Sequence, residues 1–301
     1  MSYVTEATTM SARPSAGDGM YVTLRSELVP AVPSPPLRPY VKGYLGFLES
    51  GASVRRRGLP FSSVLVILTF GEWLMASDER QPLARHSSLV RGLSRASVVY
   101  QHDAYAHGLL LDLTPLGTTL LFGVTGAELR DRIVPLDALL GCEAEVLMAR
   151  LLKLRTWPRR FAALDAWLRA RITAAPQMSP RIVWAWRRLT DSGGQVPIST
   201  LVDELGCSRR HLARSFGETV GLTPKSYARL IRFERAIARL SDGDADLGSI
   251  ALECGYYDQA HLNRDVHAFA GVSPGTLLAQ RLSGSAGFGH LEATRVRDGD
   301  P

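Results

Sequence analysis

The sequence has few cysteines and no long apolar run. Its 301 residues include only three cysteines, Cys142, Cys207 and Cys254, and none stands in CxxC spacing. An odd and sparse set excludes a disulfide framework and a thiolate zinc cluster, and it is typical of a reducing compartment. The longest apolar run, Val64 to Phe70, is far shorter than the roughly 18 residues of a bilayer span. Residues 1–19 lack the apolar stretch of a secretory signal. We therefore expect a cytoplasmic protein without membrane contact.

Signatures of catalysis are also missing. The chain shows no nucleophile elbow, no phosphate-binding glycine loop and no paired acid–base spacing. His102 and His107 lack the His-x-His and carboxylate spacing of a cupin metal site. We expect no enzyme activity, no metal and no cofactor. Two alternatives stay open: a cupin-like metalloenzyme in the N-terminal half, and an adaptor that binds a protein through the helical middle of the chain.

The composition is that of a globular protein with a concentrated basic segment. Hydrophobic residues make up 46% and charged residues 21%, which is ordinary for a folded chain of about two domains. The net charge is +6, and residues 208–239 alone hold eight basic side chains against Glu218 and Glu234. Such a concentration indicates either a polyanion partner or a solvated helix face.

The pattern along the chain predicts an α+β protein. Short apolar runs at Tyr40–Phe47, Val64–Phe70, Ser97–Tyr100 and Leu109–Leu113 predict a small β-barrel or β-sandwich. Helical spacing over residues 143–154 and 161–172 predicts a helical bridge, with Val146, Leu147, Leu151 and Leu154 among its inward residues. Arg55–Arg57 is interpreted as a solvated loop. The expected division is a flexible tail at 1–20, a β-rich domain with its bridge at 21–175, a second domain at 180–282, and a flexible tail at 283–301.

The C-terminal part repeats itself with an offset of about 50 residues. His211-Leu212-Ala213-Arg214 recurs as His261-Leu262-Asn263-Arg264, and Gly221-Leu222-Thr223-Pro224 recurs as Gly271-Val272-Ser273-Pro274. A repeat of this length indicates two copies of one supersecondary unit. Each copy predicts a helix, a turn at Gly206 or Gly255, and a second helix capped by Ser208 or Asp258. One long helix from Thr223 to Leu240 joins the copies, so this half is all-α.

In each copy the second helix places polar donors outward. Such a helix fits the major groove, where arginine matches guanine and glutamine or asparagine matches adenine. About seventeen residues of connecting helix span roughly 25 Å, a length suited to two recognition helices about one DNA turn apart. The predicted DNA-binding residues are Arg209, Arg210, Ala213, Arg214, Gln259, Ala260, His261, Asn263 and Arg264.

These stretches resemble the tandem helix-turn-helix domain of AraC/XylS-type transcription regulators. The likeness covers residues 196–281 and is carried by Leu205-Gly206-Cys207-Ser208-Arg209-Arg210-His211-Leu212, by Ala251–Gln259, and by the two Gly-x-Thr/Ser-Pro endings. Tyr256, Leu262 and Val266 stand where the family usually has phenylalanine. The resemblance implies sequence-specific binding of double-stranded DNA.

The N-terminal half resembles, more weakly, the small β-domain that precedes this domain in one subgroup of the family. Leu37-Arg38-Pro39-Tyr40-Val41 and Gly108–Gly117 carry this likeness, together with Val134–Gly141. Domains in this position sense a small-molecule effector or form homodimers, and the sequence leaves both open. It also leaves open the DNA target and whether the protein activates or represses transcription.

Overall fold

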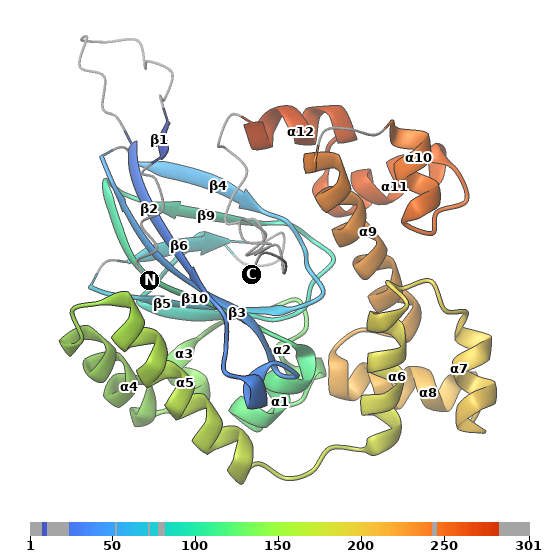
Figure 1. Ribbon diagram of the computed structural model, residues 1–301, viewed down its shortest axis with the longest axis horizontal. Coiled ribbons are helices and arrows are strands. Elements are labelled where there is room, and N and C mark those ends of the chain that lie inside the picture. Colours follow the sequence, from blue (N-terminus) through green and yellow to red (C-terminus); the bar gives the residue numbers. More distant parts are fainter. Residues whose placement is uncertain are drawn as a thin grey trace, which may run out of the picture.

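The computed structural model describes residues 8–10, 24–51, 53–71, 73–77, 82–242 and 246–282. Two β-sheets occupy one side of the molecule, and helices α6 to α12 occupy the other (Figure 1). We call residues 24–174 the β-region and residues 180–282 the helical region. The expected α+β class is therefore confirmed, with strands first and the all-α part second.

Within the described chain, the larger sheet has seven strands, all antiparallel to their neighbours, in the order β1-β2-β3-β10-β5-β8-β11. The runs predicted at Tyr40–Phe47, Val64–Phe70 and Leu109–Leu113 form its centre. Part of the segment expected to be a tail forms its first strand; the rest of both expected tails lies outside the described residues. The strands are β1 Thr8–Met10, β2 Leu24–Ala31, β3 Val41–Ser50, β5 Val64–Thr69, β8 Ser88–Arg91, β10 Tyr105–Leu113 and β11 Ile133–Pro135.

The smaller sheet has four strands in the described chain, in the order β4-β9-β6-β7. They are β4 Val54–Gly58, β6 Leu74–Ser77, β7 Ala84–His86 and β9 Val98–His102. Phe47, Ile67 and Leu110 of the larger sheet pack with Val98 and Tyr100 of the smaller one. Two sheets packed on such a shared core form a sandwich, which was one of the two predicted architectures, and they do not close into a barrel.

The interpretation of Arg55–Arg57 as a solvated loop is wrong. These residues lie in β4 and pair with β9, and two of their side chains are bonded inside the molecule. Arg56 donates to Glu49, with 2.6 Å between Nη1 and Oε2. Arg57 donates to the carbonyl of Ala270 in the helical region. A strand is recognised in a sequence by the alternation of apolar and polar residues. Three consecutive arginines show no such alternation, so the strand was not predicted.

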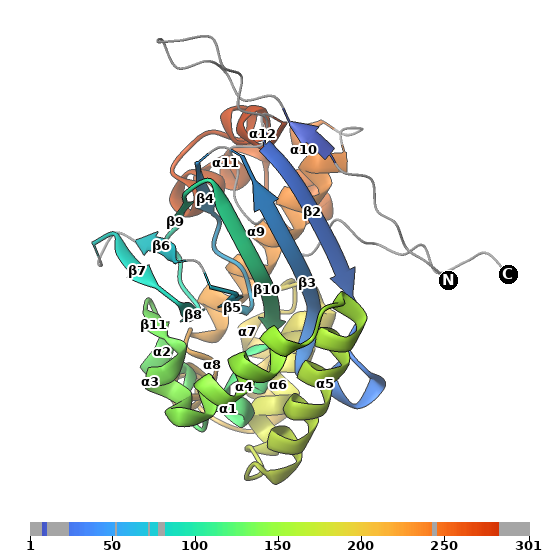
Figure 2. The ribbon, with the colours of Figure 1, turned by 90° about the vertical axis from the view of Figure 1, so that its left-hand side faces the viewer.

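Helices α1 to α5 follow the sheets, and α4 and α5 lie across the outer face of the larger sheet (Figure 2). Leu147, Leu151, Leu164 and Leu168 are buried against this face, as the helical spacing predicts. Val146, in contrast, is 69% exposed, so its predicted inward position is wrong. The helices are α1 Pro115–Phe122, α2 Gly126–Leu129, α3 Leu136–Leu140, α4 Cys142–Lys153 and α5 Trp157–Ala174.

The helical region contains two helix pairs joined by one long helix. Residues 175–179, between α5 and α6, are not helical, as the prolines in this segment predict. The helices are α6 Pro180–Asp191, α7 Ile198–Leu205, α8 Arg209–Val220, α9 Pro224–Asp242, α10 Leu247–Glu253, α11 Gln259–Ala270 and α12 Pro274–Leu282. None of the described helices has the length and apolar character needed to cross a bilayer.

One hydrophobic cluster runs through both regions. It includes Leu109 and Leu164 of the β-region and Phe216, Phe233 and Phe269 of the helical region. The two regions therefore share a core in this structure.

Candidate DNA-binding interface

The first helix-turn-helix unit consists of α7 and α8. Gly206 ends α7 in the left-handed conformation, with φ of 58°, where a side chain would be strained. Ser208 then caps α8 by accepting a hydrogen bond from the His211 N–H at 3.2 Å. Leu212 and Phe216 are buried, so the opposite face of α8 is turned to solvent. On that face Arg209, Arg210 and Arg214 are exposed and Ala213 is half-buried.

The second unit, α10 and α11, is built in the same way. Asp246 caps α10, and Asp258 caps α11 by accepting from the His261 N–H at 2.7 Å. Gly255 turns the chain with φ of 79°. Leu262 and Val266 are buried beneath the outward face. On that face Gln259, Ala260 and Arg264 are exposed, whereas His261 and Asn263 are half-buried.

The outward residues of α11 differ in how free they are to contact a ligand. The Nε of Arg264 donates to the Ala260 carbonyl at 3.2 Å, which leaves its terminal nitrogens available. The His261 ring meets the edge of Tyr256 at 5.1 Å between centroids. The Oδ1 atom of Asn263 is enclosed and has no hydrogen-bond partner among the described residues. Asn263 is thus poorly presented for reading a base.

The long helix α9 joins the units and holds them by its arginines. Arg232 donates to the Gly194 carbonyl at 2.7 Å and Arg235 to that of Gly193 at 3.4 Å. Arg239 pairs with Glu253 at 3.0 Å. Arg229 pairs with buried Asp265 at 2.6 Å, and its hydrogen bond to that carboxylate raises the pKa of Arg229.

The basic segment 208–239 therefore has two halves with different roles. The four arginines of α9 serve internal bonds, which a count of charges could not distinguish from a DNA-binding surface. Arg209, Arg210 and Arg214, in contrast, are exposed and form no ion pair with another described residue. The charge that remains available lies on the recognition helix α8 and on Lys225, which is exposed in the first turn of α9.

The β-region contacts the C-terminal ends of both second helices. Gly221, which follows α8, packs closely against Gly126 of α2. A Cβ added at Gly221 would lie 2.6 Å from the Gly126 carbonyl oxygen. Arg57 Nη1 donates to the Ala270 carbonyl at the end of α11, at 2.8 Å. A cation at a helix C-terminus is favourable because of the helix dipole. In Figure 1, α7 and α10 lie on the side of the helical region away from the sheets. The predicted DNA-binding residues lie on α8 and α11, and Arg209, Arg210, Arg214, Gln259, Ala260 and Arg264 are exposed with the β-region in place.

A polar cluster that no sequence motif indicates connects the middle of α9 to the β-region. Lys42 of β3 pairs with Glu234 of α9 at 3.3 Å, and Ser62 donates its backbone N–H to the same carboxylate at 3.0 Å. The Tyr227 hydroxyl donates to the Ser62 carbonyl at 2.9 Å and accepts from the Trp186 indole at 2.8 Å. Burial raises the pKa of Tyr227 to about 12, so it is protonated at neutral pH.

The histidines considered for a metal site have other roles. His102 Nε2 lies 2.8 Å from Glu49, and both residues are buried. His107 accepts from Arg160 across 2.9 Å and meets Phe70 edge-on. Among the described residues, no three histidine, cysteine or acidic side chains gather where they could hold a metal.

Known proteins share the helix-turn-helix part of this chain. Residues 201–280 match the family model described as a helix-turn-helix domain. The chain is 28% identical over 164 residues to a Streptomyces lividans protein described as an AraC-like transcription regulator, covering 54% of this chain and 52% of the relative. The chain thus spans about half the length of this curated relative.

Two solved structures are similar to this chain in part. The C-terminal domain of AraT, a response regulator from Geobacillus stearothermophilus, is 22% identical, with 35% of this chain and 89% of that one covered and a TM-score of 0.33. ToxT from Vibrio cholerae is 9% identical, with coverage of 85% and 98% and a TM-score of 0.45.

Residues 201–280 are thus a helix-turn-helix domain of the AraC type, and the resemblance drawn from the sequence is confirmed. Domains of this class bind DNA in transcription regulators.

Proposed function

We propose that this chain is a transcription regulator that binds specific sites in double-stranded DNA, with α8 and α11 in two successive major-groove segments. The observation that carries the proposal is the repeated unit itself: α7–α8 and α10–α11 each present the N-terminal half of a capped helix to solvent. Arginine and glutamine side chains on these halves match the edges of guanine and adenine. Arg209, Arg210, Arg214, Gln259 and Arg264 are the exposed members that support the proposal. Ala213, Ala260 and His261 supply surface beside them.

The test is selection of bound sequences from a random pool of duplex DNA by the full chain. We expect a recovered site with two conserved segments about one helical turn, near 34 Å, apart. Binding should weaken steeply as salt rises, because contacts with phosphates release counterions. A folded protein that recovers no sequence preference would contradict the proposal and would favour the adaptor alternative.

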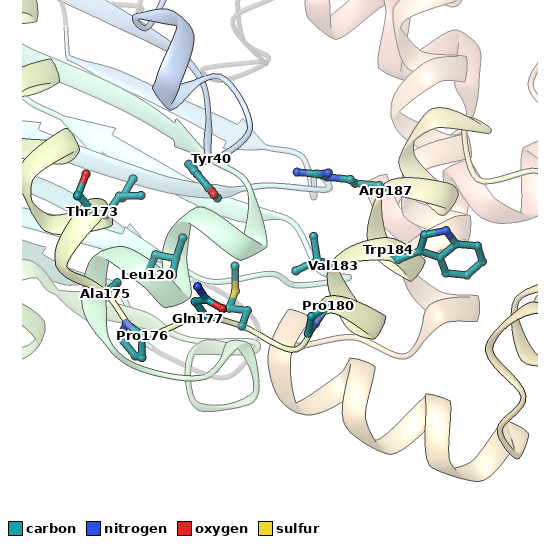
Figure 3. A pocket seen from close by; sticks show the side chains of 12 residues that line it. Tyr40, Leu120, Thr173, Ala175, Pro176, Gln177, Pro180, Val183, Trp184 and Arg187 are labelled. Carbon is teal, nitrogen blue, oxygen red and sulfur yellow. The ribbon is translucent and has the colours of Figure 1, made fainter.

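A second part of the proposal concerns regulation through the β-region by a small molecule. A cavity of about 520 Å³ lies where the β-region, the 175–179 segment and α6 meet. Figure 3 shows Tyr40 and Arg187 approaching it from opposite sides, whereas Trp184 points away. Leu120, Ile172 and Val183 contribute apolar walls, and Arg187 is the charged residue among its lining. Such a cavity suits a small amphipathic anion, since ligand sites combine apolar walls with a few polar groups.

Thermal-shift measurements with short-chain and aromatic carboxylates, each beside its uncharged amide, test this site. We expect the carboxylates to stabilise the protein more than the amides, and Arg187→Gln to remove the difference. Arg188→Gln is the matched control, because Arg188 neighbours Arg187 on α6 but pairs with Glu204 at 3.7 Å. A carboxylate preference that survives Arg187→Gln would contradict the assignment.

We also propose that the chain divides functionally into the β-region, as regulator, and the helical region, as DNA-binding domain, and that two copies associate on DNA. A palindromic arrangement of the selected site, with a dimer in sedimentation, would support the homodimer. A single non-repeated site bound by a monomer would contradict it.

A further inference from the structure

A β-bulge points Lys42 toward the helical region. In the pairing of β3 with β10, Asp112 stands opposite Gly43 and Leu113 stands opposite Val41, so Lys42 between them has no partner in the ladder. A bulge of this kind redirects the side chain of the extra residue. As a result the Lys42 ammonium leaves the sheet and reaches the Ser62 hydroxyl at 3.1 Å and Glu234 of α9 at 3.3 Å.

Glu234 is well held on the helical side of this contact. Its carboxylate accepts from the Ser62 backbone N–H at 3.0 Å and also from the Ser62 hydroxyl. Its side chain is 13% exposed. Tyr227, two helical turns earlier on the same face of α9, bonds to the Ser62 carbonyl. The middle of α9 is therefore fastened to the β-region through Lys42 and Ser62.

A second carboxylate lies next to this contact without a bond of its own. Asp112 of β10 is 4% exposed, and its Oδ1 accepts no hydrogen bond from any described residue. Burial lowers the pKa of Lys42, but Glu234 and Asp112 outweigh it and the net shift is upward. Lys42 thus has two acidic neighbours, one in the helical region and one in its own sheet.

We propose that Lys42 is a latch with two positions: paired with Glu234 it fastens the helical region to the β-region, and paired with Asp112 it remains neutralised when the two regions separate. The proposal deepens the regulatory role argued above and rests on that proposed function.

The second position follows from the unsatisfied Asp112 carboxylate. Separating the regions turns Glu234 toward water and leaves the Lys42 ammonium without that partner. Asp112 Oδ1 is buried without a hydrogen bond in the fastened state, and it gains one when Lys42 turns to it. An unsatisfied buried acceptor makes the fastened state less favourable. The bond gained on separation therefore brings the two arrangements closer in free energy, as a switch between two states requires.

The latch predicts that two similar substitutions change the ease of separating the two regions in opposite directions. Glu234→Gln removes the charge that Lys42 pairs with in the fastened state, so separation becomes easier. Asp112→Asn removes the charge that Lys42 pairs with in the separated state, so separation becomes harder. If both carboxylates merely neutralised Lys42 in one fixed structure, both substitutions would loosen the contact.

Hydrogen exchange of the Ser62 amide in the full chain measures separation directly, because this N–H donates across the interface to Glu234. The Thr69 amide, which donates to Ser88 within the β-region at 3.2 Å, is the internal reference. We expect Glu234→Gln to speed Ser62 exchange by about tenfold and Asp112→Asn to slow it by a similar factor, with Thr69 unchanged.

Faster or unchanged Ser62 exchange in Asp112→Asn would overturn the proposal. Asp112→Ser, a smaller neutral replacement, provides the same test if the asparagine variant does not fold. The measurement needs no DNA, so a failure of the latch is distinguishable from a failure of the DNA-binding proposal, which the sequence selection tests separately.

Discussion

Arg229 of α9 and Asp265 of α11 form an ion pair at 2.6 Å that attaches the second recognition helix to the connecting helix. Asp265 is 3% exposed, and the Arg229 guanidinium lies 5.5 Å from the centre of the Phe269 ring. The position of α11 therefore depends on a basic side chain that, by its place in the basic segment, would be taken for a phosphate contact.

Arg229→Met should destabilise the protein by about 3 kcal/mol, because it leaves the buried Asp265 carboxylate without its partner. Denaturant unfolding of the full chain measures this loss. Arg209→Met is the matched control, since Arg209 is exposed and surface substitutions change stability by less than about 0.5 kcal/mol. Equal effects of the two substitutions would show that the Arg229–Asp265 pair contributes little.

Arg214→Ala and Arg264→Ala should each cost about 1–3 kcal/mol of specific DNA binding, if each guanidinium reads a base edge. We expect them to relax preference in different parts of the selected site, because the two arginines lie on separate recognition helices. Binding assays on a set of single-base variants of the site measure this. Loss of preference at the same base pairs in both variants would refute the two-segment arrangement.

Gly221→Ala should destabilise the protein more than Gly206→Ala. Both glycines have positive φ, 96° and 58°, so each alanine is strained by roughly 1 kcal/mol. A Cβ at Gly221 would also meet the Gly126 carbonyl oxygen, whereas a Cβ at Gly206 has nothing within 4 Å. The additional destabilisation of Gly221→Ala relative to Gly206→Ala, measured by thermal unfolding, therefore reports the contact between the β-region and the end of α8. Equal decreases in stability for the two variants would mean that the contact between Gly126 and Gly221 accommodates the added Cβ without further destabilisation.

The Glu49 carboxylate should make the β-region sensitive to acid. Burial by itself would raise its pKa, but hydrogen bonds from His102 and Arg56 outweigh burial and lower the pKa to about 2. Since the folded pKa lies below the ordinary value of 4.5, this contribution to stability is present above pH 4.5 and is lost as the pH falls toward 2. We expect the free energy of unfolding to decrease across this window.

Glu49→Gln should flatten that decrease, because a neutral amide takes up no proton on unfolding. Unfolding curves of both proteins between pH 5 and pH 2.5 check this, within the range of the shift from 4.5 to about 2. The same slope in both proteins would show that other carboxyl groups govern the acid transition.

Local sequence was sufficient for much of the helical region. The spacing of apolar residues, the caps at Ser208 and Asp258 and the glycine turns predicted helices that are present, because capping and periodicity act within a few residues. The repeat also revealed that there are two units, and the charge pattern of α8 marked the exposed face of the first one.

Tertiary structure alone decided which charges remain free and how the regions are joined. Lys42 and Glu234 are 192 positions apart, so no local pattern connects them. The bulge that points Lys42 toward α9 appears only when β3 and β10 are paired. Likewise, the internal bonds of the α9 arginines depend on where Asp265 and the carbonyls of Gly193 and Gly194 come to lie. A sequence determines short-range conformation through each residue and its neighbours, whereas the partner of a charged side chain is set by the packing of distant elements.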